Sequence, residues 1–131
     1  EIDFIVFATS TPDYYAPGSG CLLQEKMNFK KIGILDIRMQ CSGFIYGLSI
    51  AEQYIKSGTY NNILVIGSEV QSTALNLSDT GRDTAVIFAD GAAATILSRS
   101  DDKHEILSTH SHTQGEYAKE LWVEAIHKHT F

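Results

Sequence analysis

Apolar residues along this chain fall into short continuous runs that alternate with longer amphipathic stretches. Three runs predict buried strands, because they are brief, rich in Ile, Leu, Val and Phe, and bounded by polar turns: residues 3–9, 33–39 and 63–67. A first helix is predicted from the Pro and Gly residues at 17–20 to Met27. A second is predicted over residues 42–57, where apolar side chains recur at helical spacing at Phe44, Leu48, Ala51 and Ile55. This alternation predicts an α/β fold, with a mostly parallel sheet covered on both faces.

The remainder of the chain has a weaker pattern. We expect a helix or ordered loop over residues 70–77, an exposed polar loop over 76–83 and a compact apolar block over 84–98. A tight turn at 101–103, an antiparallel strand over 105–112 and a helix over 116–127 are expected to follow. No internal repeat is present, so the second half does not copy the first.

Composition narrows the class of protein. The chain has 131 residues, 44% of them hydrophobic and 20% charged, which is typical of one globular domain with a core. A net charge of −6 argues against a nucleic-acid partner, because no basic stripe is available to neutralise phosphates. No uncharged stretch is long enough for a bilayer and no leader opens the chain, so we expect a cytoplasmic protein without a membrane partner. The chain starts directly in a strand pattern without Met, so both ends are expected to continue into a longer protein.

The chain has two cysteines, which differ in their surroundings. Cys21 falls inside the first predicted helix, whereas Cys41 falls at a strand-to-helix turn. With no export signal, we expect both thiols to be free in a reducing compartment.

Cys41 is the candidate nucleophile. An apolar strand runs into it, and the small residues Ser42 and Gly43 then open the long amphipathic helix. Partial positive charge at a helix N-terminus favours the thiolate, and a thiolate is a nucleophile for acyl groups. Its backbone N–H could also donate to an oxyanion. From spacing alone, a buried structural cysteine remains the alternative.

Several segments, in order, resemble one family. They are Cys41 to Phe44, the helix at 48–58, the strand at 63–69 and the apolar segment 88–94, supported by residues 8–14 and 108–110. Together they resemble β-ketoacyl-acyl carrier protein synthase III, of the thiolase-like superfamily. The resemblance implies a layered α-β-α-β-α architecture, of which this chain covers most of the N-terminal half. Residues 1–100 would form that half, and residues 101–131 would begin the connection to the C-terminal half.

The resemblance also implies a chemistry. Cys41 falls where the family has its acyl-accepting thiol, which takes an acyl group from acyl-CoA. Decarboxylated malonyl-acyl carrier protein then attacks the thioester, in a ping-pong Claisen condensation of fatty-acid initiation. No cofactor is implied, because CoA arrives as the substrate thioester. A homodimer is implied. The family's catalytic histidine and asparagine lie beyond the stretch that this chain matches.

Arg82 is the second candidate site residue. It matches a family arginine that contacts the nucleotide end of CoA, and a guanidinium can pair with phosphate or stack on adenine. Without the resemblance, a solvated loop arginine is an equal alternative.

The five histidines all lie near the C-terminal end of the chain: His104, His110, His112, His127 and His129. No cysteine or carboxylate accompanies them at metal-ligand spacing, so no metal site is expected. The resemblance puts His110 on a peripheral strand away from the thiol. None of the five is taken as catalytic.

Two departures from the family pattern bear on the substrate. Arg38, Met39 and Gln40 precede the cysteine where many members have small residues, which could reshape the acyl pocket. Ala16 stands where an aromatic residue is common, in a loop that closes the partner's acyl pocket in the family, so a longer or branched primer is our hypothesis. Two other functions stay open: a related synthase that condenses acyl chains for a secondary product, and a truncated non-catalytic fragment or assembly subunit.

Overall fold

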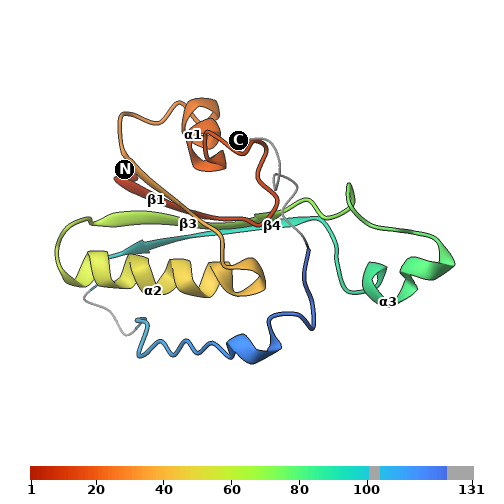
Figure 1. Ribbon diagram of the computed structural model, residues 1–131. Helices are drawn as coiled ribbons and strands as arrows, with labels where there is room; N and C mark the ends of the chain where they lie inside the picture. The colour runs from red at the N-terminus through yellow and green to blue at the C-terminus, as the bar shows by residue number, and fades with distance from the viewer. Residues whose placement is uncertain (101–103, 124–131) are drawn as a thin grey trace.

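The computed structural model describes residues 1–100 and 104–123. Within these ranges, four strands form one sheet in the order β2-β1-β3-β4: β1 (Phe4–Ala8), β2 (Gly33–Ile37), β3 (Asn62–Glu69) and β4 (Gly91–Ser98). Strand β1 pairs in parallel with β2 and with β3, whereas β4 runs antiparallel to β3 (Figure 1). The three strands predicted from apolar runs are therefore confirmed, and together they make the parallel part of the sheet.

Helices cover both faces of this sheet, as the strand and helix alternation predicts. Every residue of β1 is buried, because the strand lies between β2 and β3 with a helix on each side. Helix α2 (Gly43–Lys56) packs on the face that carries Val6 and Val65, and α1 (Ser19–Lys26) packs on the face that carries Ile5 (Figure 1). The side chains of Ile5, Val6 and Val65 are fully buried. The hydrophobic clusters on the two faces of the sheet therefore both include residues of the parallel strands.

Helix α2 lies close to the sheet because of a glycine in its second turn. A Cβ atom at Gly47 would lie 3.0 Å from Cγ1 of Val65 and 3.4 Å from Cγ1 of Val6. The helix backbone therefore rests almost directly on two valines of adjacent strands. This close approach fixes the height of α2 above the sheet, and with it the position of the residues that begin the helix.

Helix α1 is anchored to the sheet at its N-terminus. The backbone N–H of Gly20 donates to Oδ1 of Asp36, on β2, at 2.9 Å. The hydroxyl of Ser19 donates to Oδ2 of Asp13 at 2.9 Å, and its oxygen accepts the backbone N–H of Asp13 at 3.2 Å. The Gly20 bond satisfies one of the N–H groups that an α-helix leaves unpaired in its first turn, and the Ser19 bonds fix where the β1–α1 loop ends.

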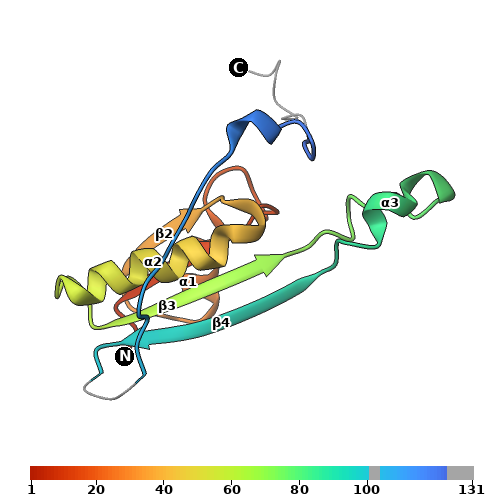
Figure 2. The ribbon, with the colours of Figure 1, turned by 90° about the horizontal axis from the view of Figure 1, so that it is seen from below.

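The antiparallel strand predicted over residues 105–112 is wrong. These residues form no strand; they run in an extended path beside α2, where the hydroxyls of Ser49 and Thr109 lie 3.1 Å apart (Figure 2). Only Ile106 and Thr109 are partly buried in this stretch, so the side chains do not alternate between a buried and an exposed face. His110 is exposed and belongs to no strand.

The helix predicted over residues 116–127 is also wrong where the structure describes it. A short 3₁₀ turn, η3 (Gly115–Tyr117), is followed by a turn up to Glu120. The predicted turn at 101–103 and residues 124–127 lie outside the described residues.

Residues 72–90, which we call the lobe, project from the end of the sheet (Figures 1 and 2). The exposed loop predicted at 76–83 is partly wrong, because it contains η2 (Asp79–Gly81) and leads into α3 (Arg82–Ala85). The side-chain oxygen of Asn76 accepts the backbone N–H of Ser78 at 3.0 Å, a local turn that starts this helical stretch. Residues 70–77 form a loop with a turn, so the helix alternative there is excluded.

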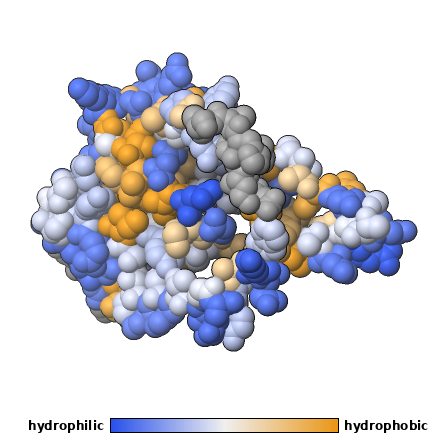
Figure 3. All heavy atoms as spheres, in the orientation of Figure 1, coloured by the Kyte–Doolittle hydropathy of each residue, from blue (hydrophilic) through white to orange (hydrophobic). Residues whose placement is uncertain are grey.

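The apolar block predicted over residues 84–98 divides into the end of the lobe and strand β4. Three of its apolar side chains are largely exposed: Val86 is 77% exposed, Ile87 64% and Ile96 59%. Leu97, on β4, packs instead against the core cluster that includes Val65. Hydrophobic surface is visible on the lobe in Figure 3.

The carboxylate of Asp90 joins the two ends of the lobe by hydrogen bonds to Ser72. Asp90 accepts the backbone N–H of Ser72 at 2.8 Å and its hydroxyl at 2.7 Å. These two bonds hold the pKa of Asp90 below its ordinary value, with the hydroxyl bond the larger cause. A lowered pKa means that the carboxylate form supports the lobe above the unfolded-state pKa, and that this support disappears as the pH falls through the folded-state pKa.

We therefore expect the lobe to loosen in acid and after Asp90→Asn. Hydrogen-exchange protection factors of residues 72–90 should fall as the pH drops below the ordinary aspartate pKa, and in Asp90→Asn they should already be low near neutral pH. Asp83→Asn, an exposed change within the lobe, is the control and should behave like the unchanged protein. Equal protection in both variants would contradict this account.

Candidate active site

Cys41 lies on a tight turn between β2 and α2. The strand ends at Ile37, and a 3₁₀ turn, η1 (Gln40–Ser42), leads directly into the helix. Gln40 adopts a φ of 46°, in the left-handed region that residues other than glycine rarely occupy. The backbone N–H of Ser42 donates to the carbonyl of Met39 at 3.2 Å and its hydroxyl donates to the same oxygen at 2.8 Å. The turn is therefore tightly constrained, and it holds the cysteine at the start of α2.

A second close approach places this turn over the carboxyl end of β1. A Cβ atom at Gly43 would lie 3.0 Å from Cβ of Ala8, so the start of α2 nearly touches the last residue of the strand. Figure 1 shows this end of α2, the end of β1 and the lobe at the same end of the sheet. In α/β proteins, ligands bind beyond the carboxyl ends of parallel strands, which is where Cys41 lies.

The thiol of Cys41 opens into a cavity. Its volume is about 330 Å³, a size suited to a small ligand or part of a larger one. Gln40 and Phe44 form the wall next to the cysteine, Glu69 lies at the end of β3, and Ala92 contributes from β4. Cys41 is a free thiol and is exposed in this chain. Three residues before the cysteine differ from the small residues that are common in the family. Of these, Gln40 lines the cavity, whereas Arg38 and Met39 do not.

Glu69 is a site residue that the sequence analysis missed. Its carboxylate accepts the backbone N–H of Ser10 at 2.8 Å, the Ser10 hydroxyl at 2.8 Å and the Thr11 hydroxyl at 2.8 Å. A glutamate that ends an apolar strand is a usable signal, because β3 is otherwise buried at its centre. Its partners were not predictable, since they lie 58 and 59 residues away in the sequence.

Cys21 offers an internal comparison for Cys41. Both thiols are free and exposed, so access alone does not separate them. Cys21 lies in the first turn of α1, where the carboxylate of Asp36 already accepts the Gly20 N–H. At the start of α2 no acidic residue is present in the first turn. The first turn of α1 has no acidic residue either, so the difference lies in Asp36, whose carboxylate binds an N–H group at the start of α1 and offsets part of that helix dipole.

Iodoacetamide near neutral pH should alkylate Cys41 at least about tenfold faster than Cys21. Peptide mass spectrometry over a time course measures both rates in one sample. Asp36→Asn should narrow the difference by accelerating Cys21, because it removes the opposing charge. Equal and slow labelling of both cysteines would count against Cys41 as a nucleophile.

Arg82 lies away from the Cys41 cavity lining, at the start of α3 on the lobe. Its guanidinium is exposed and pairs with Oδ1 of Asp79 at 3.2 Å, an exposed pair that contributes little to stability. The guanidinium is thus accessible to a ligand that approaches the end of the sheet from solvent.

None of the described histidines lines the Cys41 cavity. His104, His110 and His112 are exposed, and His127 and His129 lie outside the described residues. His110 Nε2 lies 3.2 Å from the hydroxyl of Ser108. Among residues 1–100 and 104–123, no three His, Cys, Asp or Glu side chains gather as a metal site would require.

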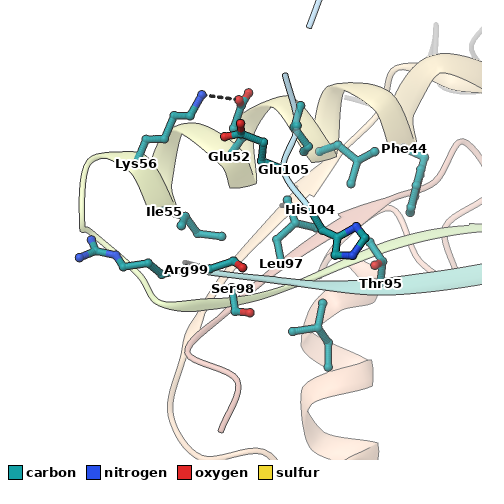
Figure 4. A pocket seen from close by; sticks show the side chains of 14 residues that line it. Phe44, Glu52, Ile55, Lys56, Thr95, Leu97, Ser98, Arg99, His104 and Glu105 are labelled. Carbon is teal, nitrogen blue, oxygen red and sulfur yellow. Dashed lines mark hydrogen bonds and ion pairs between the residues drawn. The ribbon is translucent and has the colours of Figure 1, made fainter. Parts of the chain in front are cut away.

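A larger groove lies between α2 and β4 (Figure 4). Its volume is about 1060 Å³, and it shares only Phe44 with the Cys41 cavity. The ion pair of Glu52 and Lys56, 2.6 Å apart, lies on its α2 side, and His104 also lines the groove. Cys41 does not line this groove, so the candidate chemistry belongs to the smaller cavity.

In the described residues, no helix has the length and hydropathy of a bilayer-spanning segment. The sheet order, the helices on both of its faces and the cysteine at the strand-to-helix turn define a thiolase-like fold, which solved structures similar to this chain share. The family described as 3-oxoacyl-[acyl-carrier-protein (ACP)] synthase III matches residues 35–115. The chain belongs to this family.

Relatives and solved structures agree with that assignment. The β-ketoacyl-[acyl-carrier-protein] synthase III of Methylococcus capsulatus is 42% identical over 123 residues, which cover 94% of this chain and 37% of the relative. The crystal structure of the Aquifex aeolicus synthase III matches with a TM-score of 0.82 and 44% identity, over 88% of this chain and 37% of that one. The Thermus thermophilus synthase III matches with a TM-score of 0.87 and 30% identity, over 95% and 38%. This chain thus spans little more than a third of the length of these relatives.

Proposed function

We propose that the complete protein containing this chain is an acyltransferase of fatty-acid initiation that carries its acyl group on Cys41. The observation that carries the proposal is the free, exposed thiol of Cys41 at the N-terminus of α2, in the wall of a cavity, in a chain of the synthase III family. Acyl-CoA and malonyl-acyl carrier protein would be its substrates. A homodimer in the cytoplasm is part of the same proposal.

In the first half-reaction, the Cys41 thiolate attacks the thioester carbonyl of acyl-CoA. A C–S bond forms to the enzyme, the C–S bond to CoA breaks, and CoA leaves as its thiolate, which takes up a proton. The N–H groups of Ser42 and Gly43 bond to carbonyls within the turn, so the backbone N–H of Cys41 itself is the proposed donor to the transient oxyanion.

In the second half-reaction, malonyl-acyl carrier protein loses CO₂. The electron pair released by that C–C bond forms the new C–C bond to the acyl carbonyl, and the Cys41 thiolate leaves. By the family resemblance, a histidine and an asparagine assist this step. They would come from the part of the protein beyond this chain, so the chain by itself would not complete the cycle.

The experiment combines the purified complete gene product with acyl-CoA and malonyl-acyl carrier protein. The expected products are CoA, CO₂ and 3-oxoacyl-acyl carrier protein, measured by mass spectrometry. Replacing the acceptor with a second acyl-CoA tests the related synthase of secondary metabolism: condensation with that acceptor alone would overturn fatty-acid initiation. No acyl transfer from any acyl-CoA would favour the non-catalytic alternative.

Arg82 is proposed to contact the nucleotide end of CoA. Arg82→Ala should raise the KM for acyl-CoA about tenfold while changing kcat little, because one charge-assisted contact to phosphate is lost. Arg99→Ala, which removes an exposed arginine at the opposite end of β4, is the matched control. If the KM of Arg82→Ala for acyl-CoA stays within twofold of the value for the unchanged protein, Arg82 is a solvated loop arginine that does not contact CoA.

A further inference from the structure

We propose that Gln40 is a positioning residue whose left-handed backbone aims the N–H of Cys41 into the cavity, where this N–H donates to the oxyanion that forms during acyl transfer. The proposal rests on the proposed function, since it concerns how Cys41 takes up its acyl group. Gln40 is suited to this role because it directly precedes the thiol in the sequence and lines the same cavity.

The strained backbone of Gln40 is not explained by its side chain. A φ of 46° is unfavourable for a residue with a Cβ atom, so the surrounding structure must impose it. The side-chain amide of Gln40 makes no hydrogen bond with the described residues, and the side chain is exposed. The conformation of residue 40 is therefore a property of the turn and of the peptide group that follows it.

The peptide group between Gln40 and Cys41 is held by one bond. The carbonyl of Gln40 accepts the backbone N–H of Gly43, the first residue of α2. This peptide bond is trans, and the C=O and N–H of a planar trans peptide point in opposite directions. Because the carbonyl points towards the first turn of α2, the N–H of Cys41 points away from it.

The N–H of Cys41 is also left without an acceptor. The N–H of Ser42 donates to the carbonyl of Met39 at 3.2 Å, and that of Gly43 is paired as described. Among the described residues, no atom accepts a hydrogen bond from the N–H of Cys41. An unpaired backbone donor on the residue that carries the reacting thiol is what an oxyanion site requires.

Both ends of the turn are fixed, so the conformation of Gln40 decides the direction of the next peptide group. At the end of β2, Ile37 pairs with Ala8, and a Cβ atom at Gly43 would lie 3.0 Å from Cβ of the same alanine. Only residues 38–42 link these two positions. A residue 40 that cannot hold a positive φ must therefore rotate the peptide group of Cys41 or lift the start of α2 from β1.

The test compares variants of the complete gene product that differ in whether residue 40 tolerates a positive φ. Gln40→Gly accepts it, whereas the β-branched side chain of Gln40→Val does not, and both changes remove the amide. Asn28→Val is the matched control, because Asn28 is exposed and has a φ of 51° just after α1, away from the cavity lining. It imposes the same kind of backbone strain elsewhere in the fold.

The measured quantity is the rate at which Cys41 is acetylated at saturating acetyl-CoA, followed by intact-protein mass spectrometry. Gln40→Val should lower this rate about a hundredfold, the usual loss for one oxyanion donor, and should leave the half-saturating concentration of acetyl-CoA unchanged. Gln40→Gly should be at least about thirtyfold faster than Gln40→Val, and Asn28→Val should stay within about threefold of the unchanged protein. Equal rates in the two Gln40 variants, or an equal loss in Asn28→Val, would overturn the proposal.

Alkylation by iodoacetamide separates the N–H of Cys41 from its thiol. Displacement of iodide develops no charge on an oxygen atom, so Gln40→Val should be alkylated within about threefold of the normal rate. A purely structural collapse of the turn would slow alkylation and acetylation together, which would also overturn the proposal. If Gln40→Val does not fold, Gln40→Thr, which is also β-branched but polar, takes its place with the same expected results.

An infrared measurement needs no reaction with CoA. In a Cys21→Ser background, p-nitrophenyl acetate labelled with ¹³C at its carbonyl transfers the labelled acetyl group to Cys41. A hydrogen bond from the N–H of Cys41 lowers the stretching frequency of that thioester carbonyl, so the band should lie lower in Gln40→Gly than in Gln40→Val. Equal frequencies would overturn the role of Gln40, whereas a protein that shows the difference but takes no acyl group from any acyl-CoA would overturn the proposed function.

Discussion

Cys41→Ser should reduce acyl transfer from acyl-CoA roughly a thousandfold or more. A serine hydroxyl fits the same turn, but a helix N-terminus does not ionise it near neutral pH, and the carboxylate of Glu69 in the cavity wall already accepts hydrogen bonds from Ser10 and Thr11. The first half-reaction is the one affected, so CoA release should disappear together with the overall condensation.

Intact-protein mass spectrometry gives the direct measurement. After incubation with acetyl-CoA alone, the unchanged protein should gain the mass of one acetyl group, and Cys41→Ser should gain none. Cys21→Ser is the matched control, because it replaces the other free, exposed cysteine, and it should be acylated within about twofold of the normal rate. A Cys41→Ser protein acylated as readily as the unchanged one would remove the nucleophile on which the proposed function depends.

The sequence was sufficient to predict the part of the fold that carries Cys41. Strand β1 is an unbroken apolar run and α2 has a clear helical period, so the local pattern and the final burial agree. The strand-to-helix turn at Cys41 followed from the same two elements. The positive φ of Gln40 did not, since its side chain gives no sign of a left-handed backbone.

The errors concentrate where residues lack a core to pack against. Residues 105–112 follow a predicted tight turn as the second strand of a hairpin would, yet no neighbouring strand pairs with them in the described part of the chain, and they lie along α2 instead. The apolar residues 86 and 87 suggested a compact block but are exposed on the lobe. Hydrogen-bond networks between side chains could not be predicted from the sequence either, because Glu69 and Ser10 are adjacent only through the pairing of β1 with β3.

The register of α2 on the sheet leads to the second large prediction. Gly47→Leu should destabilise the protein by about 3 kcal/mol, because a Cβ atom there already lies 3.0 Å from Val65 and 3.4 Å from Val6, and the remaining leucine atoms have no space. The thermal midpoint should fall by about 6–12 °C. Since α2 must move away from the sheet to accept the side chain, the turn that holds Cys41 moves with it.

Gly47→Ala and Gly115→Leu make this prediction specific. Alanine places a single methyl group at the close contact, and its higher helix propensity, worth about 1 kcal/mol, should offset most of the strain. At Gly115 nothing lies within 4 Å of an added Cβ atom, so leucine there should shift the midpoint by less than about 2 °C. Differential scanning calorimetry of the complete gene product measures the midpoints, and the alkylation rate of Cys41 by iodoacetamide reports the turn. If the three variants unfold at the same temperature and alkylate at the same rate, the helix is not held at the height that its contacts with Val6 and Val65 require.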